Sequence, residues 1–349
     1  MNNLSIELLK EEDDLLYQDY LVHDPEASYE HSLEVRDLIT RHFKFKPFYL
    51  VAKNDGKICA VLPLFKAKSL LEGTRFVSLP FFPHGGVLGS SPQYKRVLLV
   101  RAQQLAADTK FLEIRQAQVL PTEIATDFVK QSPIIDFFLE LKGSEKEMFD
   151  SLHKDVRYDI RKAQKNNLTV QLGKEKKFLD AFYRVYLRTR KRRGLPAWPY
   201  SLFSEALQRC NALVAVTYLK DKPIAGAFLF LDRETIEYAF AGADYRYTSL
   251  CPYYLLLWEV ICYALPLGYS ILDFGGTTTK MNDGKMYSFK EKWSSGKKEI
   301  PYYFYASHSE NIPQLESSFK LYSWYGKVWS LLPTPVIRLI SPIVIRQFI

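Results

Sequence analysis

Residues 212–276 read ALVAVTYLKDKPIAGAFLFLDRETIEYAFAGADYRYTSLCPYYLLLWEVICYALPLGYSILDFGG, and the order of segments in this stretch decides the fold. Two β-rich runs flank the turn Lys220-Asp221-Lys222, and a further strand leads into a turn that contains glycine. A long helix is expected from about Pro252, and the stretch closes on a strand that ends at Asp273-Phe274. The pattern therefore predicts one α/β unit of hairpin, strand, helix and strand.

The same order of segments occurs earlier, between residues 47 and 115. A hairpin is indicated by Asn54-Asp55-Gly56 between two β-rich runs, a helix is expected from about Pro92, and a strand from Phe111 to Arg115. A repeat of this length is typical of duplicated domains rather than of a solenoid. We therefore expect an α/β fold with mixed sheets and two similar domains.

A basic segment separates the two copies. Ser144 and Glu147 form a predicted capping box, and apolar residues at helical spacing predict one helix up to Asn166-Asn167. The apolar positions of this helix are Met148, Leu152, Val156, Ile160 and Ala163. A strand around 168–171 and a helix from Lys177 to about Arg190 follow. Residues 151–200 hold fourteen basic and four acidic residues, an excess larger than the net charge of +8 of the whole chain. Such a concentration fits an anionic, phosphate-bearing partner, and a solvated basic face is the alternative.

Cysteine and histidine usage limits the class of protein. The four cysteines are scattered without a Cys-x-x-Cys pair, and the six histidines lack the spacing of helical metal ligands. We expect no metal. With no basic-then-apolar leader at the start of the chain, a reducing cytoplasm is the expected location.

The tail from Ser318 to Ile349 has a different composition. It contains Trp324, Trp329, many aliphatic residues and four cations (Lys320, Lys327, Arg338 and Arg346), but no acidic residue. Its prolines and the central Arg338 argue against a membrane-spanning helix. Two expectations stay open: the tail returns to pack on the first domain, or it touches an anionic membrane surface peripherally.

The stretch ILDFGGTTTKMNDGKMYSFKEKW, residues 271–293, ends the second copy. It is not a nucleotide-binding P-loop, because Thr279 stands where that motif needs glycine and Met286 where it needs Ser or Thr. We expect a buried strand up to Phe274, an exit from the sheet at Gly275-Gly276, and a strand that carries Phe289-Lys290.

Three stretches together resemble the FemAB family of aminoacyl and acyl transferases, over about residues 45–345. They are VRYDIRKAQKNNLTV at 156–170, YLRTRKRRGLPAWPYSLF at 186–203, and LDFGGTTTKMNDGKMYSFKEKW at 272–293. The resemblance implies two tandem GNAT-like acyltransferase domains, which we place at 1–142 and 143–310, with the tail at 311–349.

The resemblance also implies site residues. Family members place a Phe-Lys pair at the transfer site, so Lys290 is the expected catalytic cation, aimed at the carbonyl oxygen on which charge develops. A surface lysine on an edge strand is the alternative. Asp244 is the candidate general base, Phe289 and Tyr254 are expected to contact substrate, and Asp273 is expected to be structural. Phosphates would be clamped by Arg157, Arg161, Arg190 and Arg192.

The resemblance leaves the donor open. Acyl-CoA-dependent GNAT enzymes usually bind pyrophosphate on an Arg/Gln-x-x-Gly-x-Gly/Ala turn, and here Arg246 to Cys251 has Ser249 and Cys251 in place of the glycines. We therefore expect no bound cofactor and transfer from aminoacyl-tRNA to an amine of a phosphate-bearing peptidoglycan or exopolysaccharide precursor. The alternatives are an acyl-CoA-dependent N-acyltransferase acting on a sugar and a catalytically silent polyanion-binding module.

Overall fold

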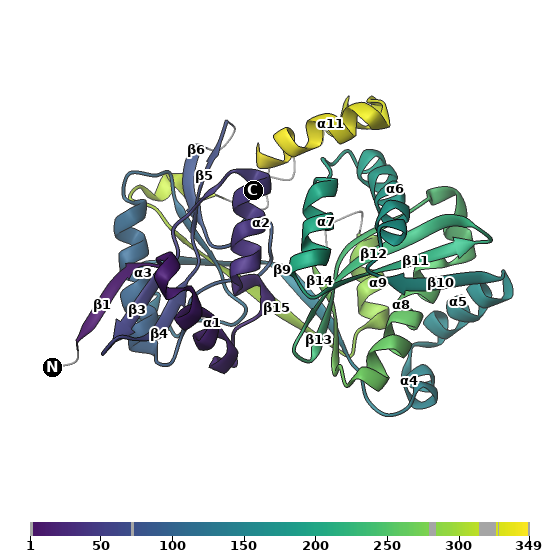
Figure 1. Cartoon of the computed structure of the whole chain (residues 1–349), viewed down its shortest axis with the longest axis horizontal. Coiled ribbons are helices and arrows are strands. Elements are labelled where there is room, and N and C mark those ends of the chain that lie inside the picture. The colour runs from purple at the N-terminus through teal and green to yellow at the C-terminus, as the bar shows by residue number, and fades with distance from the viewer. Residues whose placement is uncertain (1–2, 71–72, 279–283, 314–325, 327, 348–349) are drawn as a thin grey trace. The chain divides into compact units, whose positions relative to one another are not determined.

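The computed structural model describes residues 3–70, 73–278, 284–313, 326 and 328–347 (Figure 1). These residues fall into two compact units. Unit 1 comprises the described residues of Met1–Ile134, Glu299–Lys320 and Ile343–Ile349, and unit 2 those of Ile135–Lys298 and Leu321–Pro342. Two strands, β9 (Val129–Glu140) and β15 (Gly296–Tyr305), each contain a boundary between the units.

Unit 1 carries the first copy of the repeated pattern. Its elements are β1 (Leu4–Leu8), α1 (Asp14–His23), α2 (Leu33–Phe43), β2 (Lys46–Pro47), β3 (Leu50–Asn54), β4 (Lys57–Leu62), β5 (Phe65–Ser69), β6 (Gly73–Val77), β7 (Leu88–Gly89), α3 (Pro92–Ala106) and β8 (Leu112–Arg115). The strands pair in the orders β1-β3-β4-β7 and β15-β8-β6-β5-β2. The predicted hairpin is confirmed, with Asn54 opposite Lys57.

Unit 2 carries the second copy. Its elements are α4 (Glu145–Ser151), α5 (Lys154–Lys165), β10 (Leu168–Gly173), α6 (Lys176–Arg192), α7 (Tyr200–Arg209), β11 (Ala212–Leu219), β12 (Lys222–Asp232), β13 (Thr235–Ala243), α8 (Pro252–Ala264), β14 (Ile271–Thr277), α9 (Lys285–Trp293) and α11 (Thr334–Val344). The strand order is β10-β11-β12-β13-β14-β9.

The two copies share one topological feature. In unit 2, α8 joins β13 to the parallel strand β14, and in unit 1, α3 lies between β6 and the parallel strand β8. A helix between two parallel neighbours is the βαβ crossover that the sequence pattern predicted. The expectation of two similar mixed α/β domains is therefore confirmed.

Helices cover both faces of the sheet in unit 2 (Figure 1). Along β12, Ala225, Ala227 and Leu229 share a core with residues of α4, α5, α8 and α9. The intervening Gly226 and Phe228 face α6, because a Cβ on Gly226 would lie 3.3 Å from Phe182 and the Phe182 and Phe228 rings are 6.1 Å apart. This alternation places α5 and α8 on one face and α6 and α7 on the other.

The predicted helix after Ser144 is two helices. It breaks between Ser151 and Lys154, where the His153 ring accepts a hydrogen bond from the Asp155 N–H at 3.2 Å and begins α5. The apolar stripe is nevertheless buried throughout, from Met148 to Ala163. The stripe thus predicted the buried side correctly, while a histidine cap divides the helix.

The capping box at the start of α4 is confirmed. The Ser144 hydroxyl accepts from the Glu147 N–H at 3.3 Å, and the Glu147 carboxylate accepts from the Ser144 N–H at 2.7 Å. These bonds lower the pKa of Glu147. Ser144→Ala should reduce the free energy of unfolding by about 1 kcal/mol. Denaturant unfolding would measure this, with Ser288→Ala, at an exposed position of α9, as the control. Equal losses in both variants would contradict the capping role.

The domain boundaries differ from those we expected. Unit 2 begins at Ile135 rather than 143 and ends its main segment at Lys298 rather than 310. The difference arises because the boundaries fall inside the long strands β9 and β15, whereas the prediction placed them in the loops.

The described part of the tail follows the prediction of packing on the first domain only at its two ends. Within unit 2, Ser341 of α11 accepts a hydrogen bond from the Ala197 N–H at 3.0 Å, and Arg338 lies over the rings of Tyr183 and Tyr200. Residues 311–313 and the last described residues belong to unit 1. There Ile312 packs against a cluster that includes Phe111, and Gln347 accepts from the Leu70 N–H. Trp324, Lys320 and Lys327 lie outside the described residues. Within the described ranges, no helix is long and apolar enough to cross a membrane.

Candidate active site

A bulge in β14 shapes the centre of unit 2. β14 pairs with β13 only over Thr235–Glu237, so the two strands splay apart beyond that point. On its other side, the register with β9 shifts between Asp273 and Gly276. Gly275 there has φ +69°, which favours glycine, and its N–H donates to the Asp273 carboxylate at 2.6 Å. The exit from the sheet expected at Gly275-Gly276 is therefore a bulge, after which β14 continues to Thr277.

Lys290 reaches the bulge from α9. Its ammonium donates to the Gly275 carbonyl at 2.7 Å and to the Gly276 carbonyl at 3.1 Å. The residue is only 8% exposed, and this burial lowers the pKa of Lys290 to about 8 although nearby carboxylates oppose the shift. An ammonium has three N–H donors, so one is left beyond these two bonds.

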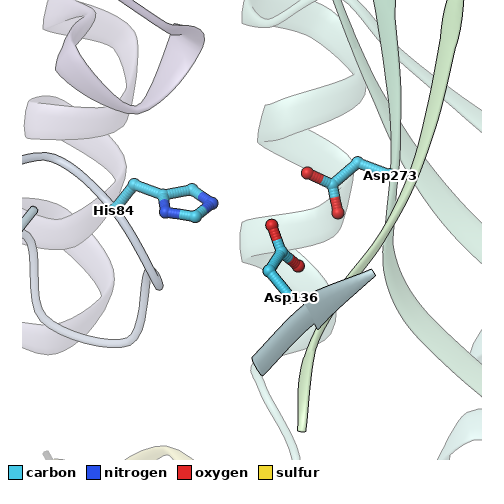
Figure 2. A group of neighbouring side chains, drawn as sticks. All are labelled: His84, Asp136 and Asp273. Carbon is cyan, nitrogen blue, oxygen red and sulfur yellow. The ribbon is translucent and has the colours of Figure 1, made fainter. Parts of the chain in front are cut away.

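Two aspartates face each other beside this lysine. Asp273 on β14 and Asp136 on β9 have carboxylate oxygens within 4.8 Å, and Figure 2 shows the two side chains pointing toward one another. His84, drawn in the same figure, belongs to unit 1. Asp136 is fully buried; burial and the neighbouring Asp273 raise its pKa to about 7, while Lys298, at 3.6 Å, and Lys290 oppose this.

The cluster of Asp136, Asp273 and Lys290 lies at β14, between its neighbours β13 and β9. Leu272, Phe274, Phe137 and Leu139 point into the core with α8, so the alternation of β14 and β9 places both aspartates on the opposite face. A carboxyl group with a pKa near 7 and an amine with a pKa near 8 both exchange protons readily at neutral pH. The arrangement can therefore accept a proton and stabilise a developing negative charge at one place.

The segment that carries Phe289-Lys290 is a helix, and the predicted strand is wrong. Phe289 and Trp293 are four residues apart and both lie against Tyr254 of α8, with ring centroids separated by 5.5 and 5.9 Å. This helical spacing buries one side of α9 in the core. The alternative of an exposed lysine on an edge strand is also wrong, because Lys290 is buried.

Phe289 and Tyr254, the predicted substrate contacts, lie together and are half-buried. Their contact with Trp293 and with the core explains both residues by packing. Asp273, predicted to be structural, does hold the bulge through the Gly275 N–H, and it also belongs to the acidic cluster.

Asp244 is a poor general base in this arrangement. Its buried carboxylate accepts from Arg246 at 2.9 and 2.5 Å and from Arg188 at 3.0 Å. Hydrogen bonds from Arg246 lower the pKa of Asp244 to about 2. It also caps the turn before α8 by accepting from the Arg246 N–H, the structural role weighed against catalysis. The sequence analysis did not select Asp136, whose pKa is higher than that of Asp244. In the sequence, Asp136 is the one charged residue within the β-rich run PIIDFFL.

The four predicted phosphate ligands do not converge. Arg157 and Arg161 belong to α5, whereas Arg190 and Arg192 belong to α6 on the opposite face of the sheet. Arg157 donates to the Asp150 carbonyl and Arg161 lies over the Phe149 ring. Arg190 donates twice to the Pro196 carbonyl and so fixes the loop after α6. Of the α6 pair, Arg192 is the exposed one.

A family model matches a large part of unit 2. Residues 150–290 match the model described as Acetyltransferase (GNAT) domain, which covers β10 to β14 and most of α9. Two units with the same βαβ crossover give the chain a tandem GNAT-like fold, and the match to the family model lies in the second unit.

Solved structures with the same fold give the particular relatives. FemX has 13% sequence identity and a TM-score of 0.67, over 91% of this chain and 100% of that chain. L-PGS from Bacillus licheniformis has 12% identity and a TM-score of 0.56, over 92% and 98%. A tandem GNAT protein from the clavulanic acid biosynthesis pathway has 10% identity and a TM-score of 0.54, over 89% and 100%. No curated protein matched. The similarity to FemX confirms, for the fold, the resemblance to the FemAB family.

Proposed function

We propose that this protein transfers an aminoacyl or acyl group to an amine of a phosphate-bearing cell-envelope or exopolysaccharide precursor. The observation that carries the proposal is the buried cluster of Lys290, Asp136 and Asp273 at the splayed strands of a GNAT-type domain. Attack by an amine on an acyl carbonyl requires both loss of a proton and stabilisation of an oxyanion. The cluster offers a group for each task.

Asp136 and Lys290 have separate roles in this proposal. Asp136, with its pKa of about 7, accepts the proton of the attacking amine. Lys290, already held by two backbone carbonyls, directs its remaining N–H toward the oxygen on which charge develops. Because the carbonyls fix the ammonium before the reaction, little reorganisation is needed as the charge forms.

The turn before α8 favours aminoacyl-tRNA over acyl-CoA as the donor. Residues 245–250 form a 3-10 helix, and Cys251 follows with φ +59° at the start of α8. The Cys251 thiol donates to Asp159 at 3.2 Å, so a side chain and a carboxylate stand near the helix start at which a pyrophosphate would need bare N–H groups. The proposal places the protein in the cytoplasm, in peripheral contact with the membrane. Its support is a solved structure of the same fold, with a TM-score of 0.57, described as the C-terminal domain of a putative lysylphosphatidylglycerol synthetase.

A transfer assay distinguishes the donors. The full chain is incubated with a radiolabelled aminoacyl-tRNA and a nucleotide-linked envelope precursor that has a free amine, and the labelled product is counted. Product that disappears after RNase treatment supports the proposal. Product that instead requires acyl-CoA and releases CoA favours the acyl-CoA-dependent N-acyltransferase. Binding of precursor or tRNA without turnover from either donor would contradict the transferase and leave a polyanion-binding module.

A further inference from the structure

Unit 2 has a pocket at the C-terminal end of α6, lined by residues other than those of the Lys290 cluster. Its walls come from Arg188, Lys191 and Arg192 of α6, from the turn 243–246 that follows β13, and from Ser330 and Thr334 near the start of α11. The cavity measures about 490 Å³, which leaves room for a phosphate ester or a diphosphate. Four cationic side chains line it against one carboxylate, Asp244.

Asp244 orients two of these cations. Its side chain is 2% exposed, whereas those of its partners Arg188 and Arg246 are 42% and 53% exposed. Each guanidinium has five N–H donors, and the Asp244 carboxylate accepts from Nη1 of Arg188 and from Nε and Nη2 of Arg246. One buried anion thus preorganises two guanidinium groups that still face the solvent with further donors.

The remaining cations complete the pocket. Arg192 lies over the Tyr245 ring, with 5.8 Å between the guanidinium carbon and the ring centroid, which restricts its orientation. Lys191 is its half-buried neighbour on α6. With four cations and one aspartate the pocket is strongly positive, and fork-shaped guanidinium groups suit the oxygens of a phosphoryl group better than a single carboxylate does.

We propose that this pocket binds a phosphoryl group of a phosphate ester or diphosphate. The inference deepens the proposed function, because it gives a place in unit 2 to the phosphate of the precursor. The ligand can be a soluble phosphorylated molecule or the headgroup of an anionic lipid. The second source is supported by Leu331, Val336 and Leu339, which are exposed apolar residues in and just before α11, the helix that begins at the pocket wall.

Binding measured without turnover tests the pocket independently of transfer. The full chain is titrated with inorganic pyrophosphate by calorimetry, and it is sedimented with vesicles of phosphatidylglycerol or of phosphatidylcholine at low and high salt. The pocket variant is Lys191→Gln with Arg192→Gln. The control is Lys177→Gln with Arg184→Gln, which removes the same charge from exposed positions on the same helix. Circular dichroism verifies that both variants are folded.

The pocket variant should weaken binding of pyrophosphate, of phosphatidylglycerol vesicles or of both by at least about tenfold, because charge-assisted phosphate contacts are lost, while the control changes binding much less. Weaker binding of pyrophosphate alone identifies a soluble ligand, and weaker binding of vesicles alone identifies a lipid headgroup. The proposal that the pocket binds a phosphoryl group would be overturned by equal weakening in the pocket variant and the control. It would also be overturned if the unmodified chain bound neither probe. If the pocket variant unfolds, Arg192→Lys should still weaken binding, because it retains the charge but loses the paired N–H donors of the guanidinium. Unchanged binding by Arg192→Lys would also count against the proposal.

Discussion

Replacing Lys290 by alanine should slow transfer by a factor on the order of 10², because removal of one oxyanion donor typically has this effect in other enzymes. The structure adds an expectation about stability. The ammonium satisfies the Gly275 and Gly276 carbonyls and interacts electrostatically with Asp136 and Asp273. The alanine variant should therefore also unfold at a lower temperature. Single-turnover kinetics and thermal melting on the same sample would measure both effects.

Two further variants separate the charge of Lys290 from its hydrogen bonds. Lys290→Gln keeps N–H donors for the carbonyls of the bulge but has no charge, so it should recover part of the lost stability and little of the lost rate. Lys285→Ala, at an exposed position on the same helix, is the matched control and should change neither. A folded Lys290→Ala protein with unchanged turnover would reduce Lys290 to a structural residue of the bulge.

Asp136→Asn should change how stability depends on pH. In the folded chain the pKa of Asp136 is raised to about 7 from an ordinary value of 3.8. Between these values the folded state keeps a proton that the unfolded state has lost, so the free energy of unfolding falls as pH rises through this window. Asparagine cannot titrate, so the variant should lose less stability from pH 4 to 7.

At higher pH, the titration of Lys290 changes the free energy of unfolding in the opposite direction. Its pKa is lowered to about 8 from 10.5, so above pH 8 the unfolded state binds more protons and stability rises with pH up to about 10.5. Denaturant unfolding from pH 4 to 10 would record both windows. Asp221→Asn, in the exposed turn between β11 and β12, is the control. If Asp136→Asn and the unmodified chain showed the same slope between pH 4 and 7, the burial of a protonated carboxyl would be refuted.

The same variant also tests the assignment of the base. If Asp136 accepts the proton, transfer by the unmodified chain should fall below about pH 7, and Asp136→Asn should be slow at every pH. A pH-rate profile that keeps its acidic limb in Asp136→Asn would assign the proton transfer to another group.

The sequence predicted the elements whose signal is local. The hairpin at Asn54-Asp55-Gly56, the capping box at Ser144, and the helices that start at Pro92 and Pro252 all follow from turn and cap chemistry within a few residues. The repeated order of segments gave the tandem fold. Lys290 was selected as a candidate through a resemblance, because nothing local in the sequence distinguishes it from an exposed lysine.

What could not be predicted depends on contacts between distant segments. Asp136 gains its raised pKa from burial and from Asp273, which is 137 positions along the chain, so no window of sequence contains the pair. The lowered pKa of Asp244 has a similar origin, since one of its partners, Arg188, comes from α6. The helix α9 was read as a strand because its support, the aromatic contact of Phe289 and Trp293 with Tyr254, comes from α8.

The strands that contain the unit boundaries impose an order on folding during synthesis. In unit 1, β8 pairs with residues 302–305 of β15, and the Tyr303 hydroxyl accepts from the Leu120 N–H. Residues 302–305 leave the ribosome only after all of 135–298, so the main segment of unit 2 can fold while β8 still lacks this neighbour. Until then Leu112 and Ile114 stand on an unpaired strand edge, the kind of surface that recruits other chains. A nascent chain arrested before β15 would therefore depend on chaperones to keep its first 134 residues from aggregating.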